Sequence, residues 1–247
     1  MYTIKKYIIN LCLFSLTALF LVQFILGSNI MAALNSSPEE TTTGKKVLYL
    51  TFDDGPTIIT NDLLDVLKQC NVKATFFVVG KEICGREDLL KRIYKEGHSI
   101  GLHTFSHNFK KIYKSDDIFV KEMLDDQKKV KEITGLNTNL IRFPGGSSKH
   151  LDSEMLEKLH KNNLKVYDWN ASIEDGVNPH LSVDKLVNNS KKYKHRNDQI
   201  ILLMHCNSNN TNTIKALPQI VNYYRSNGYA IKPITDKTPE YHYSFRK

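Results

Sequence analysis

Residues 47–56 have the sequence Val47-Leu48-Tyr49-Leu50-Thr51-Phe52-Asp53-Asp54-Gly55-Pro56. Six residues of mostly apolar, β-favouring character end in two adjacent carboxylates, and the Gly-Pro pair then forces a turn. In α/β folds, the loops that leave the carboxyl ends of parallel strands carry the chemistry. Asp53 and Asp54 therefore mark a candidate site, and their mutual repulsion predicts a cation nearby. An ordinary surface turn is the alternative.

The composition is that of a globular protein. The chain has 247 residues, 41% of them hydrophobic, which is enough for one large α/β domain or two small ones. Its formal net charge is +8, but the basic residues are scattered, so we expect a solvated basic face and no nucleic-acid partner. The four cysteines include no Cys-x-x-Cys pair, which argues against a structural zinc site. A bridge between Cys70 and Cys84 stays open.

An apolar run at 7–26 predicts a transmembrane helix, because about 20 such residues cross the hydrocarbon of a bilayer. Lys5 and Lys6 precede it and favour a cytoplasmic N-terminus, with the rest of the chain outside the cell membrane. A cleaved signal peptide, which would give a secreted protein, is the alternative, but residues 30–33 lack a small-x-small cleavage pattern. We therefore expect a stub and membrane anchor at 1–34 and a flexible linker at 35–46.

From residue 47 onward, strand-like and helix-like segments alternate. The strand candidates are 47–52, 74–79, 99–102, 140–143, 165–169, 200–204 and 229–234. Amphipathic segments lie between them at 61–69, 87–96, 116–134, 152–161 and 211–226, several of them followed by the glycine that typically ends a helix. This alternation predicts an α/β fold with a parallel sheet, and the near-regular repeat favours closure into a barrel.

A second polar cluster, His103-Thr104-Phe105-Ser106-His107, follows the third strand candidate. Two imidazoles four residues apart would lie on one face of a helical turn, a spacing that metals accept. Asp54 would complete a set of two histidines and one carboxylate, which suits Zn²⁺ or another divalent transition metal such as Co, Ni or Mn. Two unrelated surface histidines are the alternative.

Three further clusters follow later strands. Arg142 precedes Pro144-Gly145-Gly146, so its guanidinium could reach a carboxylate while the glycines expose backbone N–H groups. A salt-bridged arginine before a turn is the alternative. Trp169, the only tryptophan, is either a core residue or a flat wall for a sugar ring. His205 ends the apolar strand at 200–204, on the rim where active sites are built.

These motifs resemble those of the polysaccharide deacetylases, the NodB-homology enzymes of carbohydrate esterase family 4. The resemblance covers about residues 46–234 and rests on the motifs Thr51-Phe52-Asp53-Asp54-Gly55-Pro56, His103-Thr104-Phe105-Ser106-His107, Arg142-Phe143-Pro144-Gly145-Gly146 and Leu202-Leu203-Met204-His205. It implies a distorted (β/α)7 barrel, which we place at 47–236 with a C-terminal tail at 237–247. It also implies metal-dependent removal of N-acetyl, or sometimes O-acetyl, groups from polysaccharides.

The resemblance also implies roles for individual residues. Asp53 would be the general base, held by Arg142, and His205 would be the general acid. The Gly145 N–H would help to bind the oxyanion. The implied metal ligands are Asp54, His103 and His107, and we assign substrate binding to Pro144, Gly145, Gly146 and Trp169.

The fourth motif departs from the family pattern Asp-x-x-Asp-Trp. Residues 172–176 keep the second aspartate, Asp175, but have Ser172 and Gly176 at the other two positions. We expect Asp175 to support His205, with Asp168 as the alternative. Substrate choice stays open for the same reason.

The membrane anchor indicates where the substrate lies. A domain tethered outside the membrane reaches wall polymer, so we expect N-acetylglucosamine of peptidoglycan to be the substrate. Chitooligosaccharide, xylan and exopolysaccharide are alternatives, and a decayed, membrane-tethered glycan-binding protein is an alternative of another class. No protein partner is implied.

Overall fold

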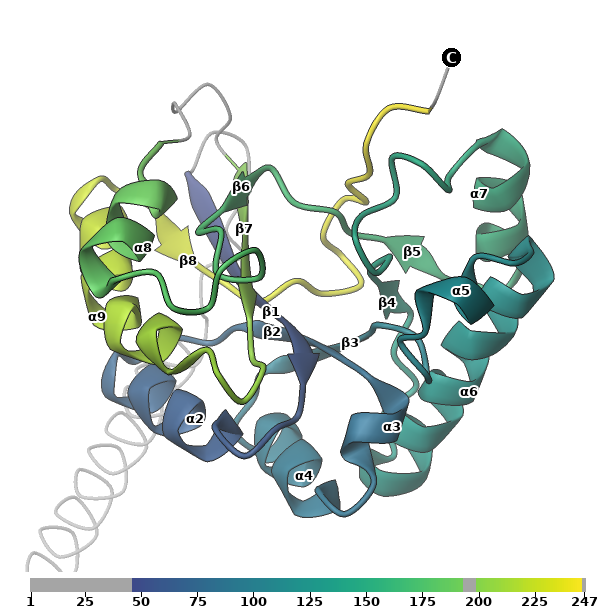
Figure 1. The fold of residues 1–247 in the computed structure, drawn as a ribbon, viewed down its shortest axis with the longest axis horizontal. Coiled ribbons are helices and arrows are strands. Elements are labelled where there is room, and N and C mark those ends of the chain that lie inside the picture. The colour runs from purple at the N-terminus through teal and green to yellow at the C-terminus, as the bar shows by residue number, and fades with distance from the viewer. Residues whose placement is uncertain (1–45, 193–198, 246–247) are drawn as a thin grey trace, which may run out of the picture. The chain divides into compact units, whose positions relative to one another are not determined.

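The structure, a computed structural model, describes residues 46–192 and 199–245. Its strands are parallel and lie in the order β5-β4-β3-β2-β1-β7-β6, with β8 paired to β1 (Figure 1). In chain order they are β1 (Val47–Gly55), β2 (Thr75–Val78), β3 (Ser99–Leu102), β4 (Leu140–Ile141), β5 (Lys165–Val166), β6 (Ala171–Ser172), β7 (Gln199–His205) and β8 (Ala230–Ile231). The predicted parallel sheet is confirmed.

Helices cover the outer side of this curled sheet (Figure 1). They are α2 (Thr60–Gln69), α3 (Gly80–Ile83), α4 (Glu87–Lys95), α5 (Phe109–Ile112), α6 (Asp116–Thr134), α7 (Ser153–Lys161), α8 (Val183–Ser190) and α9 (Thr211–Ser226). Leu48, Leu50 and Phe52 of β1 belong to the large core that also contains helix residues. Val47 and Tyr49 belong to a smaller core that is shared with other strands. Because successive side chains of a strand point to opposite faces, β1 is buried on both faces and reads as one apolar run.

Local signals explain where α6 begins and ends. The Ser115 side chain accepts a hydrogen bond from Ile118 N and caps the start of the helix. Gly135 ends it with φ 76°, a left-handed conformation that glycine adopts without a steric penalty. The sequence pattern misses α3, α5, α8 and β6. The first two helices and β6 are too short to show a period, but α8 does follow a serine cap, Ser182, whose side chain accepts from Lys185 N.

The sheet curls without closing, so the predicted barrel is open on one side. Among residues 46–192 and 199–245, no ladder joins β5 to β6. The chain after β5 pairs instead with the C-terminal segment: Asp168 N donates to Tyr241 O at 2.7 Å, and Tyr241 N donates to Val166 O at 3.1 Å. Tyr167 N bonds to β4, so Tyr241 occupies the opposite edge of β5. Part of the segment expected as a tail, 237–247, thus packs on the sheet.

Some expectations concern residues outside the described ones. The anchor predicted at 7–26 lies there, as does the linker at 35–46 except for Lys46. Among the helices that the structure does describe, none is both long enough and apolar enough to cross a membrane. Cys70 and Cys84 are free thiols, and so is Cys206.

Candidate active site

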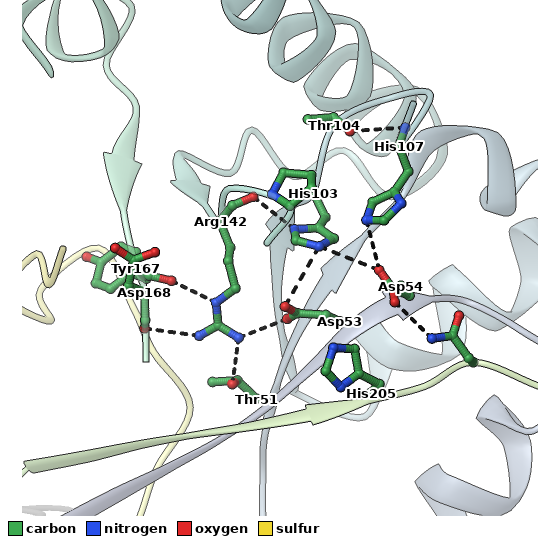
Figure 2. Close-up of polar contacts among 12 residues, drawn as sticks. Thr51, Asp53, Asp54, His103, Thr104, His107, Arg142, Tyr167, Asp168 and His205 are labelled. Carbon is green, nitrogen blue, oxygen red and sulfur yellow. Dashed lines mark hydrogen bonds and ion pairs between the residues drawn. The ribbon is translucent and has the colours of Figure 1, made fainter. Parts of the chain in front are cut away.

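The carboxyl ends of the central strands bring the polar clusters of the sequence together (Figure 2). Asp53 lies opposite His205 in the ladder between β1 and β7. His103 directly follows β3, and Arg142 directly follows β4. All strands of a parallel sheet run in the same direction, so their carboxyl ends lie side by side. Residues that follow different strands, far apart in the sequence, therefore meet there.

Asp54, His103 and His107 form a cluster that fits a metal ion. Asp54 Oδ1 lies 3.2 Å from His107 Nε2 and 3.5 Å from His103 Nε2, and the ligand atoms all lie within 4.8 Å of one another. Asp54 Oδ1 is buried and has no hydrogen-bond partner among the described residues. A cation between the three side chains would compensate that buried oxygen. Two imidazoles and one carboxylate are a donor set typical of zinc and other divalent transition metals.

Surrounding groups orient these ligands. His103 Nδ1 lies 2.9 Å from Arg142 O. Because a carbonyl only accepts, Nδ1 carries the proton and Nε2 presents its lone pair toward Asp54. Asn207 Nδ2 donates to Asp54 Oδ2 at 2.8 Å, which leaves Oδ1 facing the histidines.

The electrostatics of the cluster also favour metal binding. Burial, followed by the electrostatic influence of the neighbouring His103, lowers the pKa of His107 from 6.5 to about 4, so this ring is neutral at pH 7. Burial acts to raise the pKa of Asp54, but the neighbouring histidines and Asn207 outweigh it, and the net shift is downward. A neutral imidazole and an ionised carboxylate are the forms that bind a metal.

The two histidines do not lie on a helical turn, and that prediction is wrong. Residues 103–107 form an irregular loop in which Thr104 and His107 have positive φ angles of 69° and 50°. Two backbone N–H groups of the loop bond to side chains of α6: His103 N donates to Asp126 Oδ2, and Ser106 N donates to Glu122 Oε2. Within the loop, His107 N donates to Thr104 Oγ1 at 3.1 Å (Figure 2). These buried carboxylates therefore set the loop that brings the two rings together.

Arg142 is fully buried and holds Asp53. Its Nη1 donates to Asp53 Oδ1 at 2.8 Å and to Thr51 Oγ1 at 2.7 Å, and its Nε donates to Tyr167 O at 2.7 Å. The guanidinium also lies 4.1 Å from the centre of the Phe77 ring. With its donors satisfied on several sides, Arg142 has little freedom to move and fixes the direction of the Asp53 carboxylate.

His205 faces the carboxylates from β7 and is paired with Asp175. Its Nδ1 lies 2.8 Å from Asp175 Oδ1, and its backbone N donates to Asp175 Oδ2 at 2.9 Å. Burial alone would lower the pKa of His205. The hydrogen bond and charge of Asp175, with the charges of Asp53 and Asp54, outweigh burial and raise it from 6.5 to about 9. The ring is therefore protonated at neutral pH.

Asp168, the alternative partner for His205, lies elsewhere in the site. Its carboxylate accepts from Ser147 N, Ser147 Oγ and Tyr243 N. It therefore ties the glycine-rich loop after β4 to the C-terminal segment. The actual partner of His205, Asp175, also accepts a hydrogen bond at its Oδ2 from Thr213 Oγ1, at 2.7 Å.

Comparison with known proteins identifies the family. A polysaccharide deacetylase domain profile matches residues 40–167. The chain belongs to the polysaccharide deacetylase family. It is 36% identical over 194 residues to a peptidoglycan-N-acetylglucosamine deacetylase of Bacillus cereus, a match that spans 75% of this chain and 68% of that one.

Solved structures agree with this assignment. A polysaccharide deacetylase from Bacillus cereus superposes with a TM-score of 0.73 at 34% identity, over 79% of this chain and 95% of that one. The catalytic domain of a peptidoglycan N-acetylglucosamine deacetylase from Eubacterium rectale superposes with a TM-score of 0.76 at 30% identity, over 86% and 99% of the two chains. This deacetylase is therefore an enzyme that removes acetyl groups from polysaccharides, and the alternative of a decayed glycan-binding protein is set aside.

The deacetylase has a cavity of about 420 Å³ over these residues, which we call the catalytic cavity. Of the four residues assigned to substrate binding from the sequence, Gly145 and Trp169 line this cavity, whereas Pro144 and Gly146 are not among its lining residues. Pro144 is buried, and its carbonyl accepts from Tyr113 OH at 2.6 Å. A Cβ on Gly146 would lie 3.1 Å from the Trp169 ring, so this glycine allows the indole to pack closely against the loop. Both residues shape the loop that presents Gly145.

Several residues of the deacetylase site were not predicted from the sequence. Asn207 follows β7 by two residues, and the same rule that selects His205 at the end of this strand could have found it. Phe109 and Val177 line the catalytic cavity with side chains that are 49% and 89% exposed. No pattern marks them, because single exposed apolar residues are common on protein surfaces.

Proposed function

We propose that this deacetylase uses a divalent metal ion to remove the acetyl group from N-acetylglucosamine in peptidoglycan. The metal dependence is supported by the buried, unpartnered oxygen of Asp54 between His103 and His107. The substrate is supported by relatives named peptidoglycan N-acetylglucosamine deacetylases in Bacillus cereus and Eubacterium rectale.

One observation carries the proposal: a single cavity contains a neutral and a protonated imidazole on its two sides. His107, with a pKa of about 4, can bind a metal at neutral pH, and His205, with a pKa of about 9, can donate a proton. Amide hydrolysis needs both functions, because the carbonyl is a poor electrophile and the nitrogen is a poor leaving group. A site that only bound a glycan would not need one neutral and one protonated histidine.

The mechanism begins with the attack of water. Asp54, His103 and His107 would hold the divalent metal ion, which would polarise the acetyl carbonyl and lower the pKa of water. Asp53, oriented by Arg142, accepts the proton of the attacking water while the water oxygen bonds to the carbonyl carbon. Gly145 N–H donates to the oxyanion that forms, a contact typically worth about 3–4 kcal/mol.

The second half of the reaction breaks the C–N bond. Because His205 Nδ1 is engaged by Asp175, the proton available to substrate is on Nε2. Transfer of this proton to the leaving nitrogen releases the glucosamine amine and acetate, and His205 is left neutral. The charge of Asp175 favours the imidazolium form, so His205 takes up a proton from solvent before the next reaction.

Acetate release tests the proposal. The full chain is purified, treated with a chelator and assayed with and without Zn²⁺, Co²⁺, Ni²⁺ or Mn²⁺ on peptidoglycan, chitooligosaccharide, acetylated xylan and acetylated exopolysaccharide. We expect activity only with metal, and the highest rate on peptidoglycan. Full activity without metal would overturn the metal dependence, and a higher rate on another glycan would replace the substrate.

We also propose that residues 7–26 anchor the deacetylase in the cell membrane, with the catalytic domain outside. The length of the apolar run and the lysines before it support this location. Membrane fractionation and N-terminal sequencing of the mature protein test it. A mature N-terminus beyond residue 26 would make the protein a secreted enzyme.

A further inference from the structure

A second cavity, of about 360 Å³, adjoins the catalytic cavity. Asp54 and His107 line both cavities, so the two meet at the candidate metal cluster. We call this second space the flanking cavity. Besides the two shared residues, its lining includes Ile58, Lys81 and Arg86. The mechanism above makes no use of these three.

The two cavities differ in charge. The ionisable residues lining the catalytic cavity are acidic residues and histidines, with no lysine or arginine among them. The flanking cavity has two cations, Lys81 and Arg86. Glu82 also lines it and is engaged mainly by Arg86, whose Nη1 donates to Glu82 O at 2.9 Å and to Glu82 Oε2 at 3.4 Å. Lys81 Nζ lies 3.9 Å from Glu82 Oε1, a distance too long for a hydrogen bond, and its side chain is 53% exposed. Lys81 therefore offers a positive charge that is only weakly paired.

Exposed apolar side chains mark both cavities as one binding surface. The described residues include five large hydrophobic side chains that are exposed. Phe109 and Val177 line the catalytic cavity and Ile58, 73% exposed, lines the flanking cavity, so three of the five lie here. Single exposed apolar residues need no explanation, but their concentration around one site indicates a ligand. Apolar faces of sugar rings are suited to such side chains.

We infer that the glycan crosses both cavities and that Lys81 binds a carboxylate on the sugar next to the acetylated one. The inference rests on the proposed function, because the acetylated sugar must occupy the catalytic cavity. The chemistry recognised is a sugar carboxylate, which either the 3-O-lactyl group of a muramic acid unit or a uronic acid supplies. A neutral chitooligosaccharide offers no such group.

A binding measurement tests the inference independently of turnover. Trp169 is the only tryptophan and lines the catalytic cavity, so its fluorescence reports glycan binding. The metal-loaded full chain with His205→Ala, which slows hydrolysis, is titrated with four tetrasaccharides. One alternates N-acetylglucosamine with N-acetylmuramic acid, one is the same with its lactyl carboxylates amidated, one contains uronic acid, and one is neutral chitotetraose.

We expect the acidic tetrasaccharides to bind more tightly than the amidated and neutral ones at low salt. Adding Lys81→Gln should reduce the ratio of the affinities by about two- to fivefold, the range typical of half-exposed ion pairs. Lys81→Glu should reverse the preference, and about 0.5 M salt should remove it in the parent. Comparison of the muramic and uronic acid glycans identifies the natural source of the carboxylate.

Lys128→Gln is the matched control, because Lys128 is an exposed lysine of α6 that lines neither cavity. It should leave the affinity ratio unchanged. Equal affinity for the acidic and amidated glycans, or an unchanged ratio in both Lys81 variants, would overturn the inference. Failure of the proposed function looks different: the wild-type chain would release no acetate from any glycan, whatever the fluorescence titrations show.

Discussion

Two histidines of the catalytic cavity, His107 and His205, have opposite protonation states at neutral pH. Burial lowers the pKa of both His107 and His205, yet the first ends at about 4 and the second at about 9. The difference lies in their neighbours. His107 lies near another imidazole, and its carboxylate neighbour Asp54 is 3.2 Å away and shared with His103. His205 Nδ1 lies 2.8 Å from Asp175 Oδ1, and the other side chain that bonds to this carboxylate, Thr213, is neutral. A dedicated carboxylate thus decides whether a buried histidine presents a lone pair or a proton.

The largest effect is expected on the metal side. Asp54→Ala should abolish both metal binding and activity, since partners outside the ligand set alone typically alter affinity by about 10–100-fold and a direct ligand should exceed that. Metal content is measured on purified protein by atomic emission. Asp53→Asn is the matched control, because it removes the neighbouring charge and should lose turnover while it keeps the metal. Loss of metal in Asp53→Asn as well would show that the two aspartates act as one ligand set.

On the other side, His205→Ala should slow deacetylation by about 10²–10⁴-fold, the usual cost of a lost general acid. Metal content should stay at the wild-type level. The loss should be much smaller on an activated acetyl ester, whose leaving group needs no proton. Rates on glycan and ester are compared directly. Equal losses on the two substrates would assign His205 to structure or to oxyanion binding.

Asp175→Asn should bring the pKa of His205 closer to that of His107. Without the carboxylate charge, burial should bring the pKa of His205 from about 9 toward 6.5 or below, a shift of about two units or more. The acid form of His205 would then disappear at lower pH, so the alkaline limb of kcat/KM should move to lower pH. The pH–rate profile and the NMR titration of the ring measure this shift. An unmoved alkaline limb would assign it to another group.

The same pair affects stability with a defined sign. The folded-state pKa of His205 is raised, so its contribution is fully present below about pH 6.5 and is lost as pH rises through about 9. Thermal unfolding of the metal-free chain across this interval should show the decline in the wild type and not in Asp175→Asn.

The smallest effect is expected from Asn207, which touches only one ligand. Asn207→Ala removes the donor to Asp54 Oδ2 and should weaken metal binding by about 10–100-fold while the metal-loaded enzyme keeps much of its activity. Competition with a chromogenic chelator measures the affinity. Asn212→Ala, which removes a bond from α9 to Leu181 O in the segment before α8, should leave the affinity at the wild-type value. Equal affinities for the two variants would show that Asn207 does not orient the ligand.

The pattern along single segments predicted much of the scaffold. The run 47–52 becomes the first part of β1, 99–102 matches β3, and 116–134 matches α6, because each carries its own periodicity and end signals. The irregular parts were harder. The loop that contains His103 and His107 was expected to be helical, because spacing alone does not show that its N–H groups bond to Glu122 and Asp126.

The sequence alone placed each polar cluster at a strand end. It also showed that these clusters contain the residue types that deacetylation requires. That information is local: an apolar run, a turn and the side chain that follows. The sequence motif favoured Asp175 over Asp168 as the partner of His205, and the structure shows this pair. Tertiary structure alone decided that Asn207 bonds to Asp54 from a segment 153 residues away. It also decided the opposite protonation of His107 and His205, because a pKa depends on burial and on the charges a few ångströms away. Those neighbours come from strands whose order in the sheet does not follow their order in the chain.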